Sequence, residues 1–293
     1  MLSIMDFIND LYNPILSFLP RALLVAAVSA VVCAIVGTHV VLRGMAFIGD
    51  AVAHAVFPGL AFSFITGGSL VLGGAVAGIA TAILVALLSQ NRRLKEDSVI
   101  GVLFVGAFAL GIVIISRSAG YAGSLQDFLF GSLTGVSVDD IPLMLIGSLV
   151  VISILAFFNK ELVAVSIDRE TARALGIPVL FVDIVLYVSV ALAVVISVQT
   201  IGNVLVLALL VAPAATARLV TNRMSSMMTV ASILSLISSF VGIYLSWALD
   251  LPAGATIVCV LTVVFASVWL CAPHHGILAK YFSTWKMHKN LSD

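Results

Sequence analysis

Two side chains that can bind a metal ion lie close together in an apolar stretch of the sequence. Asp50 and His54 fall within the segment from Arg43 to Gly59, which opens an apolar run that continues to Thr66. Because the two residues are four positions apart, a helix places their side chains on one face, roughly 6 Å apart, where they can hold one ion together. An ionisable residue inside a membrane span costs on the order of 2.5–3.5 kcal/mol, so we expect the pair to have a use, and binding a metal ion in transit is one.

The types of ligand narrow the choice of metal. One carboxylate and one imidazole suit Mn(II), Fe(II) or Zn(II), whereas Mg(II) and Ca(II) prefer oxygen ligands alone and Cu(I) prefers sulfur. Two ligands bind weakly, but a two-fold homodimer could bring two copies each of Asp50 and His54 together into a four-ligand site. The alternative is a polar lock, in which the pair fixes the packing between helices without touching a substrate.

The overall composition is that of an integral membrane protein. Hydrophobic residues make up 62% of the chain, charged residues 10%, and the mean hydropathy is +1.24. No soluble core needs so much apolar sequence. The formal net charge of zero gives no reason to expect nucleic acid binding. No Lys or Arg precedes Arg21, so the amino terminus lacks the basic region of a cleaved signal peptide, and we expect the first apolar run to remain in the mature protein.

The apolar runs predict an all-α polytopic membrane protein with about nine transmembrane helices. The valine-rich stretch 182–219 is about twice as long as one span requires, so we divide it at a turn between Gln199 and Asn203. An eight-span protein is the alternative. The expected spans cover 22–42, 47–66, 70–89, 99–116 and 141–158, then two spans within 182–219, and finally 227–249 and 255–271.

The distribution of basic residues predicts the orientation, because short cytoplasmic loops accumulate Lys and Arg. With nine spans, every lysine and arginine except Arg21 and Arg117 falls on one side of the membrane. We therefore expect the amino terminus outside and the carboxyl-terminal tail inside. An eight-span count would break this sorting.

The polar segment from Asp168 to Pro178 is predicted to form a short cytoplasmic helix. Asp168 can cap its start, Glu170 favours its first turn, and Gly176 supplies its end. An ordinary solvated loop helix is one interpretation. The other is docking into a groove on a cytoplasmic partner, which the small side chains of this segment would suit, at Ala172, Ala174 and Gly176.

Three further histidines are second-tier candidates for metal contact. His39 stands alone near the end of the first span, where a packed or interfacial role explains it more simply. His274 and His275 lie after the last span, in a tail expected at the membrane surface. The cysteines have no Cys-x-x-Cys spacing, so neither a disulfide framework nor a zinc knuckle is indicated.

Known hydrolase motifs do not occur in the sequence. It contains no Gly-x-x-x-x-Gly-Lys-Ser/Thr phosphate loop, so any ATP must be hydrolysed by another chain. It also contains neither His-Glu-x-x-His nor Gly-x-Ser-x-Gly, which argues against an intramembrane hydrolase. A proton-coupled secondary carrier could also keep an Asp and a His in the membrane, although such a carrier has no ATPase to receive a cytoplasmic helix.

Taken together, these segments resemble the permease subunit of manganese/zinc/iron ABC importers. The resemblance covers nearly the whole chain and rests on the run Arg43 to Gly59, the segment 168–178, Ala212-Pro213-Ala214-Ala215-Thr216-Ala217 and Ala272-Pro273-His274-His275-Gly276. It implies one permease domain over 1–293, with an ABC importer fold of the cobalamin/metal-chelate type, a coupling-helix segment at 159–178 and a cytoplasmic tail at 274–293. His274-His275 departs from the family, whose members commonly carry a basic residue there, and adds an accessory metal contact to the hypotheses.

The resemblance also implies a function and partners. Two permease copies would work with a cytoplasmic ABC ATPase dimer and an extracellular metal-binding protein, in the lipid of a bacterial cytoplasmic membrane. The permease itself would be no enzyme and hold no permanent cofactor, since ATP binds to the partner subunit. Asp50 and His54 are then the metal-coordinating pair. The residues expected to couple to the ATPase are Asp168, Glu170, Ala172, Ala174, Leu175 and Gly176.

Manganese is the preferred substrate on sequence grounds. Leu42-Arg43-Gly44-Met45 and the ending Pro58-Gly59 resemble the manganese branch of this family. Zinc or iron, carried by the same machine, is the alternative.

Overall fold

The protein is helical throughout the part of the chain that the structure describes. The computed structural model describes all residues except 1–2, 14–15, 91–95, 117–137, 139 and 273–293. The helices are α1 (Ile4–Leu11), α2 (Phe18–Leu42), α3 (Ile48–Ala55), α4 (Phe57–Thr66), α5 (Leu70–Leu88), α6 (Glu96–Ile115), α8 (Asp140–Phe157), α9 (Asn159–Ile167), α10 (Arg169–Ala174), α11 (Val179–Ile201), α12 (Asn203–Val220), α13 (Met224–Leu249) and α14 (Ala253–Cys271).

The long helices account for the predicted spans. Among the described residues, eight segments are long and apolar enough to cross a membrane, and the bent pair of α8 and α9, with 62° between its two parts, brings the number to the predicted nine. The division of 182–219 is also confirmed, since α11 and α12 meet at Gly202, whose φ of +80° suits a residue without a Cβ. The segments 117–137 and 273–293 lie outside the described residues.

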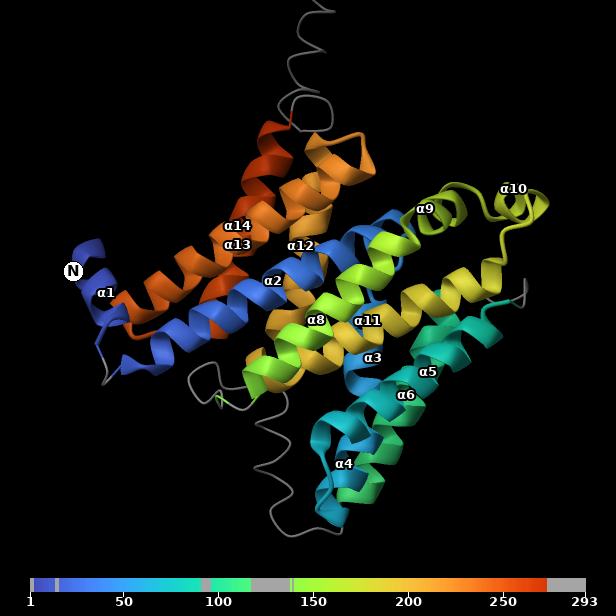
Figure 1. Ribbon diagram of the computed structural model, residues 1–293, viewed down its shortest axis with the longest axis horizontal. Helices are drawn as coiled ribbons and strands as arrows, with labels where there is room; N and C mark the ends of the chain where they lie inside the picture. The colour runs from blue at the N-terminus through green and yellow to red at the C-terminus, as the bar shows by residue number, and fades with distance from the viewer. Residues whose placement is uncertain (1–2, 14–15, 91–95, 117–137, 139, 273–293) are drawn as a thin grey trace, which may run out of the picture.

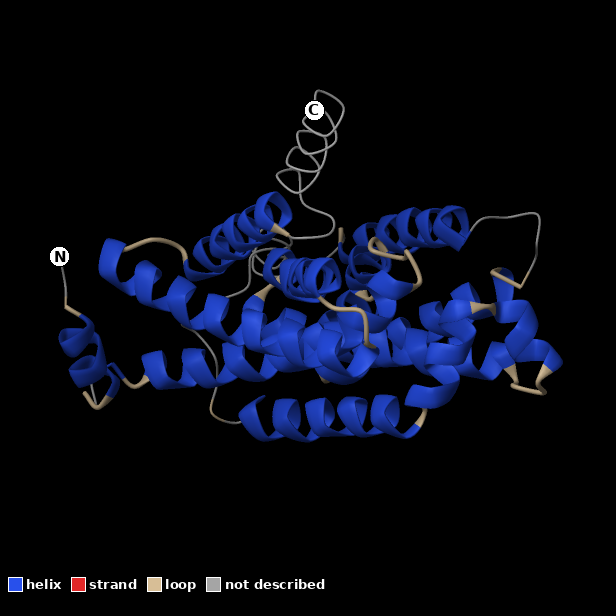
Figure 2. Cartoon of the chain, turned by 90° about the horizontal axis from the view of Figure 1, so that it is seen from above, coloured by secondary structure: helices blue, strands red, loops and turns tan. Residues whose placement is uncertain are grey.

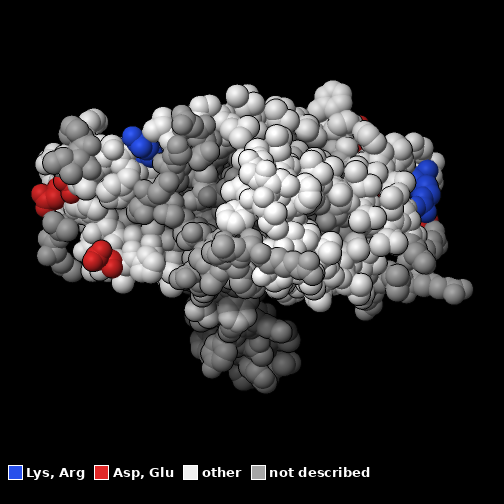
Figure 3. All heavy atoms as spheres, turned by 90° about the horizontal axis from the view of Figure 1, so that it is seen from below, with Lys and Arg blue, Asp and Glu red and all other residues white. Residues whose placement is uncertain are grey.

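Charged side chains lie toward the two ends of the long helices. On the face seen in Figure 3, Lys and Arg as well as Asp and Glu side chains lie toward both ends of the molecule, and the described residues visible between them are uncharged. Figure 1 places α9 and α10 together at one of these ends. An uncharged middle of this kind fits the hydrocarbon core of a bilayer.

A short helix at the amino terminus was not predicted. In α1, Ser3 and Asp6 form a reciprocal capping box, a signal that the sequence already contained. Phe7 is fully buried in edge-to-face contact with three aromatic side chains of α13, with ring centroids 5.2–5.9 Å apart. This contact pins α1 against the last turns of a membrane span, at Phe240, Tyr244 and Trp247.

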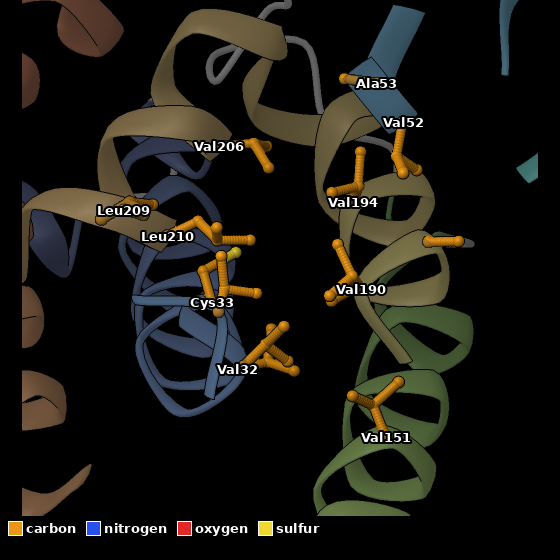
Figure 4. Packing of buried hydrophobic residues seen from close by; sticks show 14 of the residues in the cluster. Val32, Cys33, Val52, Ala53, Val151, Val190, Val194, Val206, Leu209 and Leu210 are labelled. Carbon is orange, nitrogen blue, oxygen red and sulfur yellow. The ribbon is translucent and has the colours of Figure 1, made fainter. Parts of the chain in front are cut away.

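The core is formed where α2, α3, α11 and α12 pack together. Figure 4 shows Val190 and Val194 of α11 facing Cys33 of α2 and Leu210 of α12, with Val52 of α3 close by. Figure 2 shows from above that the helices run side by side along the length of the molecule. The site helix α3 therefore rests on a closely packed support.

Glycines let several spans approach closely. A Cβ on Gly73 would lie 2.4 Å from the carbonyl oxygen of Gly59, so α4 and α5 touch there through backbone. Gly78 likewise leaves room for the side chain of Val56, at the junction of α3 and α4. Small residues at such crossings allow the van der Waals contact that holds membrane helices together.

Gly37 supports a stability prediction. A Cβ at this position would lie 1.8 Å from the carbonyl oxygen of Leu210, so Gly37→Ala must push α2 away from α12. We expect the variant to lose about 1–3 kcal/mol of stability. The measurement is the melting temperature of the detergent-purified permease. Gly106→Ala is the matched control, since nothing lies within 4 Å of its added Cβ, and an equal loss in both variants would contradict the prediction.

Candidate metal site

The second span is broken at the site. The sequence predicted one apolar run from 47 to 66, and that run is confirmed as a span, but it consists of two helices that meet at Val56. Pro58, in the first turn of α4, has no N–H to donate to the carbonyl of His54, which ends the hydrogen-bond ladder of α3. The polar pair therefore sits on a short helix with its own end, inside the span.

Asp50 and His54 contact each other directly. The Nδ1 atom of His54 lies 3.2 Å from Oδ1 of Asp50 and 3.0 Å from the main-chain carbonyl oxygen of Asp50. When Nδ1 carries the proton, it donates to these oxygens, and Nε2 keeps its lone pair for a metal ion. The side chains are 38% exposed for Asp50 and 17% for His54, so the carboxylate remains accessible in the single chain.

Asn203, the first residue of α12, reaches the same imidazole. Its Nδ2 atom lies 3.4 Å from both ring nitrogens of His54. The residue is 3% exposed, and its buried Oδ1 atom has no hydrogen-bond partner among the described residues. A buried amide oxygen without a partner is a costly arrangement that a bound cation would satisfy. Sequence analysis had placed Asn203 only in a turn, and no local pattern linked it to His54.

Aromatic side chains cover the other sides of the imidazole. Phe104 and Phe108 of α6 stand edge to face with His54, with ring centroids 5.1 and 5.2 Å away. They shield the ring from lipid and restrict its rotation. The site is thus lined by apolar side chains around a few polar groups, as ligand sites in proteins commonly are.

One chain supplies an incomplete set of metal ligands. Within the described residues, no group of three or more His, Cys, Asp and Glu side chains could hold a metal ion. Asp50 and His54 offer one carboxylate and one imidazole, and the Asn203 amide adds one oxygen donor. This mixed oxygen and nitrogen set fits Mn(II), Fe(II) and Zn(II).

His39, the other predicted histidine that the structure describes, does not join this pair. His39 is fully buried in α2, and neither of its ring nitrogens has a hydrogen-bond partner among the described residues. His274 and His275 lie outside the described residues.

The predicted cytoplasmic helix is present as α10. Asp168 caps it by accepting hydrogen bonds from the Glu170 backbone N–H and the Thr171 hydroxyl. The Thr171 hydroxyl, together with nearby backbone N–H groups, lowers the pKa of Asp168. This cap is therefore present above the ordinary pKa of an aspartate and is lost as the pH falls through the lowered value. Gly176 ends the segment with a φ of +81°.

Ala172, one of the residues expected to couple to the ATPase, faces the inside of the protein instead of solvent. Ala172 is 2% exposed and packs inside the chain, so it cannot touch a partner directly. The residue instead fixes α10 to the helices beneath it, because a six-residue helix must bury at least one side chain to stay attached. Leu175 is 74% exposed, and the other exposed members are Asp168, Glu170, Ala174 and Gly176.

These features define a class of protein. A polytopic helical membrane protein with a polar pair inside a broken span, and a capped helix projecting at one end, has the construction of a membrane permease. Residues 15–272 match the ABC 3 transport family. The chain belongs to this family and is a multi-pass protein of the cell membrane, the permease subunit of an ABC importer.

Named relatives match over most of their length. The manganese transport system membrane protein MntC of Halalkalibacterium halodurans is 40% identical over 266 residues, covering 91% of both chains. The chelated iron transport system membrane protein YfeC of Yersinia pestis is 33% identical and covers 92% of this chain and 91% of its own.

A solved structure has the same fold. PsaBC from Streptococcus pneumoniae, in complex with a Fab, contains a chain with a TM-score of 0.82 and 32% identity. The match covers 96% of this chain and 99% of that one. The predicted ABC importer permease fold is thereby confirmed.

Proposed function

We propose that this chain conducts Mn(II) through the membrane as the permease of an ATP-driven importer. The observation that carries the proposal is the Asp50–His54 pair, 3.2 Å apart on a short helix within a span, with the buried amide oxygen of Asn203 unpartnered nearby. The names of the manganese transport relatives support the choice of metal. The second candidate is iron or zinc, carried by the same importer. The similarity to an iron transport protein favours iron.

The proposed importer is a homodimer. A two-fold axis beside α3 would bring two sets of Asp50, His54 and Asn203 together, which completes the coordination that one chain lacks. Moderate affinity suits such a site, because a transport path must release what it binds. Membership of the ABC 3 transport family argues against the alternative of a proton-coupled secondary carrier.

ATP hydrolysis belongs to a separate chain in this proposal. Two cytoplasmic ATPase subunits dock on α10 through its exposed residues, chiefly Leu175 and Ala174, and an extracellular metal-binding protein delivers the ion. ATP binding moves α10 and rocks the spans, so that Asp50 and His54 exchange access between the two sides of the membrane.

Cellular metal content tests this function. Strains without their native importers receive the permease with its ATPase and binding protein, and manganese, iron and zinc are measured by mass spectrometry. A rise in manganese alone supports the proposal. A rise in iron or zinc would change the identity of the transported metal and leave the proposed importer mechanism in place. No rise in any metal, despite a complex that copurifies, overturns the proposal.

Gly176 provides a separate test of the role of α10. Gly176→Val places a β-branched residue at a φ of +81°, which costs about 1–3 kcal/mol and alters the exit from α10. We expect slower manganese uptake into vesicles at unchanged metal affinity. Gly176→Asn is the control, because asparagine tolerates this conformation. Equal uptake in the valine and asparagine variants would remove α10 from the coupling mechanism.

A further inference from the structure

A buried ion-pair cluster lies between α10 and the segment that leads into the metal site. Its centre is Asp183 in the second turn of α11, whose side chain is 1% exposed. Arg43 places Nη1 2.6 Å from Oδ1 of this carboxylate, and Arg169 binds Oδ2. Gln90, just beyond α5, contributes Nε2 at 3.4 Å from the same Oδ2. One carboxylate therefore joins four parts of the chain.

Each arginine lies close to a functional element. Arg169 is the first residue of α10, and Arg43 caps the end of α2, five positions before α3 begins at Ile48. Figure 1 shows α9, α10 and the start of α11 together at one end of the molecule. Through Asp183, the helix proposed to meet the ATPase is thus connected to the segment that carries Asp50 and His54.

The segment between α2 and α3 is held against α9 and α11 at further points. Arg43 Nε donates to the hydroxyl of Ser166 in α9 at 3.1 Å. The Tyr187 hydroxyl lies 3.5 Å from Sδ of Met45, and both of these side chains are buried. A displacement of α11 or α9 must therefore carry residues 43–45 with it. The next helix along the chain is α3.

The two arginines differ in how firmly they are held. The Arg43 side chain is 5% exposed, whereas the Arg169 side chain is 35% exposed. Because both side chains are buried, Arg43 and Asp183 must remain paired, since either charge left alone would be strongly destabilised. Arg169 can turn toward water when its contact breaks. Its bond to Asp183 is therefore the more accessible of the two ion pairs.

We propose that Asp183 is a positioning residue that transmits the movement of α10 to the α2–α3 segment, with Arg169 as its separable contact. The inference rests on the proposed function, since it assumes that α10 meets the ATPase and that α3 carries the metal ligands. When the Arg169–Asp183 bond is formed, α10 and the segment between α2 and α3 move together. With the bond lost, α10 moves without shifting Asp50 and His54.

The test compares two arginines of the same helix. The full transporter, with its ATPase and binding protein, is reconstituted in lipid vesicles as wild type, Arg169→Gln and Arg173→Gln, and Mn(II) uptake and ATP hydrolysis are recorded together. Arg173 is the matched control because its ion pair among the described residues is local, with Glu170 at 3.9 Å. We expect Arg169→Gln to lower the number of ions transported per ATP about tenfold. Arg173→Gln should keep the wild-type ratio.

Two further measurements separate transmission from a merely structural role. Equilibrium Mn(II) binding to the purified permease and copurification of the ATPase should be unchanged in Arg169→Gln. Arg169→Lys, which keeps the charge, should recover most of the transport ratio. A variant that loses metal binding or its ATPase would show that Arg169 supports the structure, and this result would overturn the proposal.

Other results also decide against the inference. A wild-type ratio in Arg169→Gln, or an equal fall in Arg173→Gln, overturns it while leaving the proposed function intact. Failure of the proposed function looks different, because wild-type vesicles would then take up no metal ion. That outcome removes both proposals together.

Discussion

Replacing Asp50 with alanine is expected to abolish manganese uptake while the transporter still assembles. The change removes the only carboxylate that contacts the His54 imidazole among the described residues, and it leaves an imidazole and an amide as ligands. Neutral ligands alone hold Mn(II) poorly, since this ion prefers carboxylate oxygen. Transport should fall to the background of vesicles that lack the permease. Asp50 is partly exposed, so its removal leaves no large cavity.

Radioactive manganese uptake into reconstituted vesicles measures this effect, and copurification of the ATPase measures assembly. Asp10→Ala is the matched control, a partly exposed acidic residue in α1. Normal uptake in Asp50→Ala would exclude the residue from the path. Loss of assembly together with uptake would favour the polar lock, in which Asp50 and His54 fix helix packing. His54→Ala should behave as Asp50→Ala does.

Replacing Asp183 with alanine is expected to cause the largest loss of stability. The Arg43 guanidinium, with a side chain only 5% exposed, would then be buried without a carboxylate. Breaking a buried ion pair by removing one partner costs about 3–5 kcal/mol. The melting temperature of the purified permease and its level in membranes report this loss. Asp168→Ala is the control, since its carboxylate is exposed and only caps α10.

A double variant separates the charge from the packing. Asp183→Leu combined with Arg43→Met removes both buried charges and should recover most of the stability, because apolar side chains can replace a buried ion pair without loss. Arg169 can turn to solvent in this variant, since its side chain is 35% exposed. A double variant as unstable as Asp183→Ala would show that the stability at this position does not depend on pairing of charges.

Several features of the structure were predictable because they depend on neighbours in the sequence. Continuous apolar runs specify membrane spans whatever the rest of the chain does, since backbone polar groups in lipid must be satisfied within each helix. The cap at Asp168 and the stop at Gly176 are likewise local, and both are present. The four-residue spacing places Asp50 and His54 on one helix face, and their side chains do meet.

The broken span shows a structural feature that the hydrophobic pattern of the sequence does not reveal. The apolar run from 47 to 66 was recognised, yet the break at Val56 was missed although Pro58 was visible in the sequence. Proline is tolerated near helix starts and also breaks helices, and hydropathy does not distinguish these two uses. The burial of Ala172 was missed for a related reason, because a six-residue helix is too short for its pattern to reveal which face packs inward.

The sequence by itself determined the spans, the carboxylate–imidazole pair and the capped helix α10, and its motifs were sufficient to recognise the family. Only the tertiary structure brought Asn203 to His54, 149 positions away, and Arg43 to Asp183, 140 positions away. Such contacts depend on how the spans cross, and crossings are decided by small residues such as Gly37 and Gly73 on helices that are apolar on every side. A helix that is hydrophobic all round carries no periodic signal for its partner, so packing alone selects it.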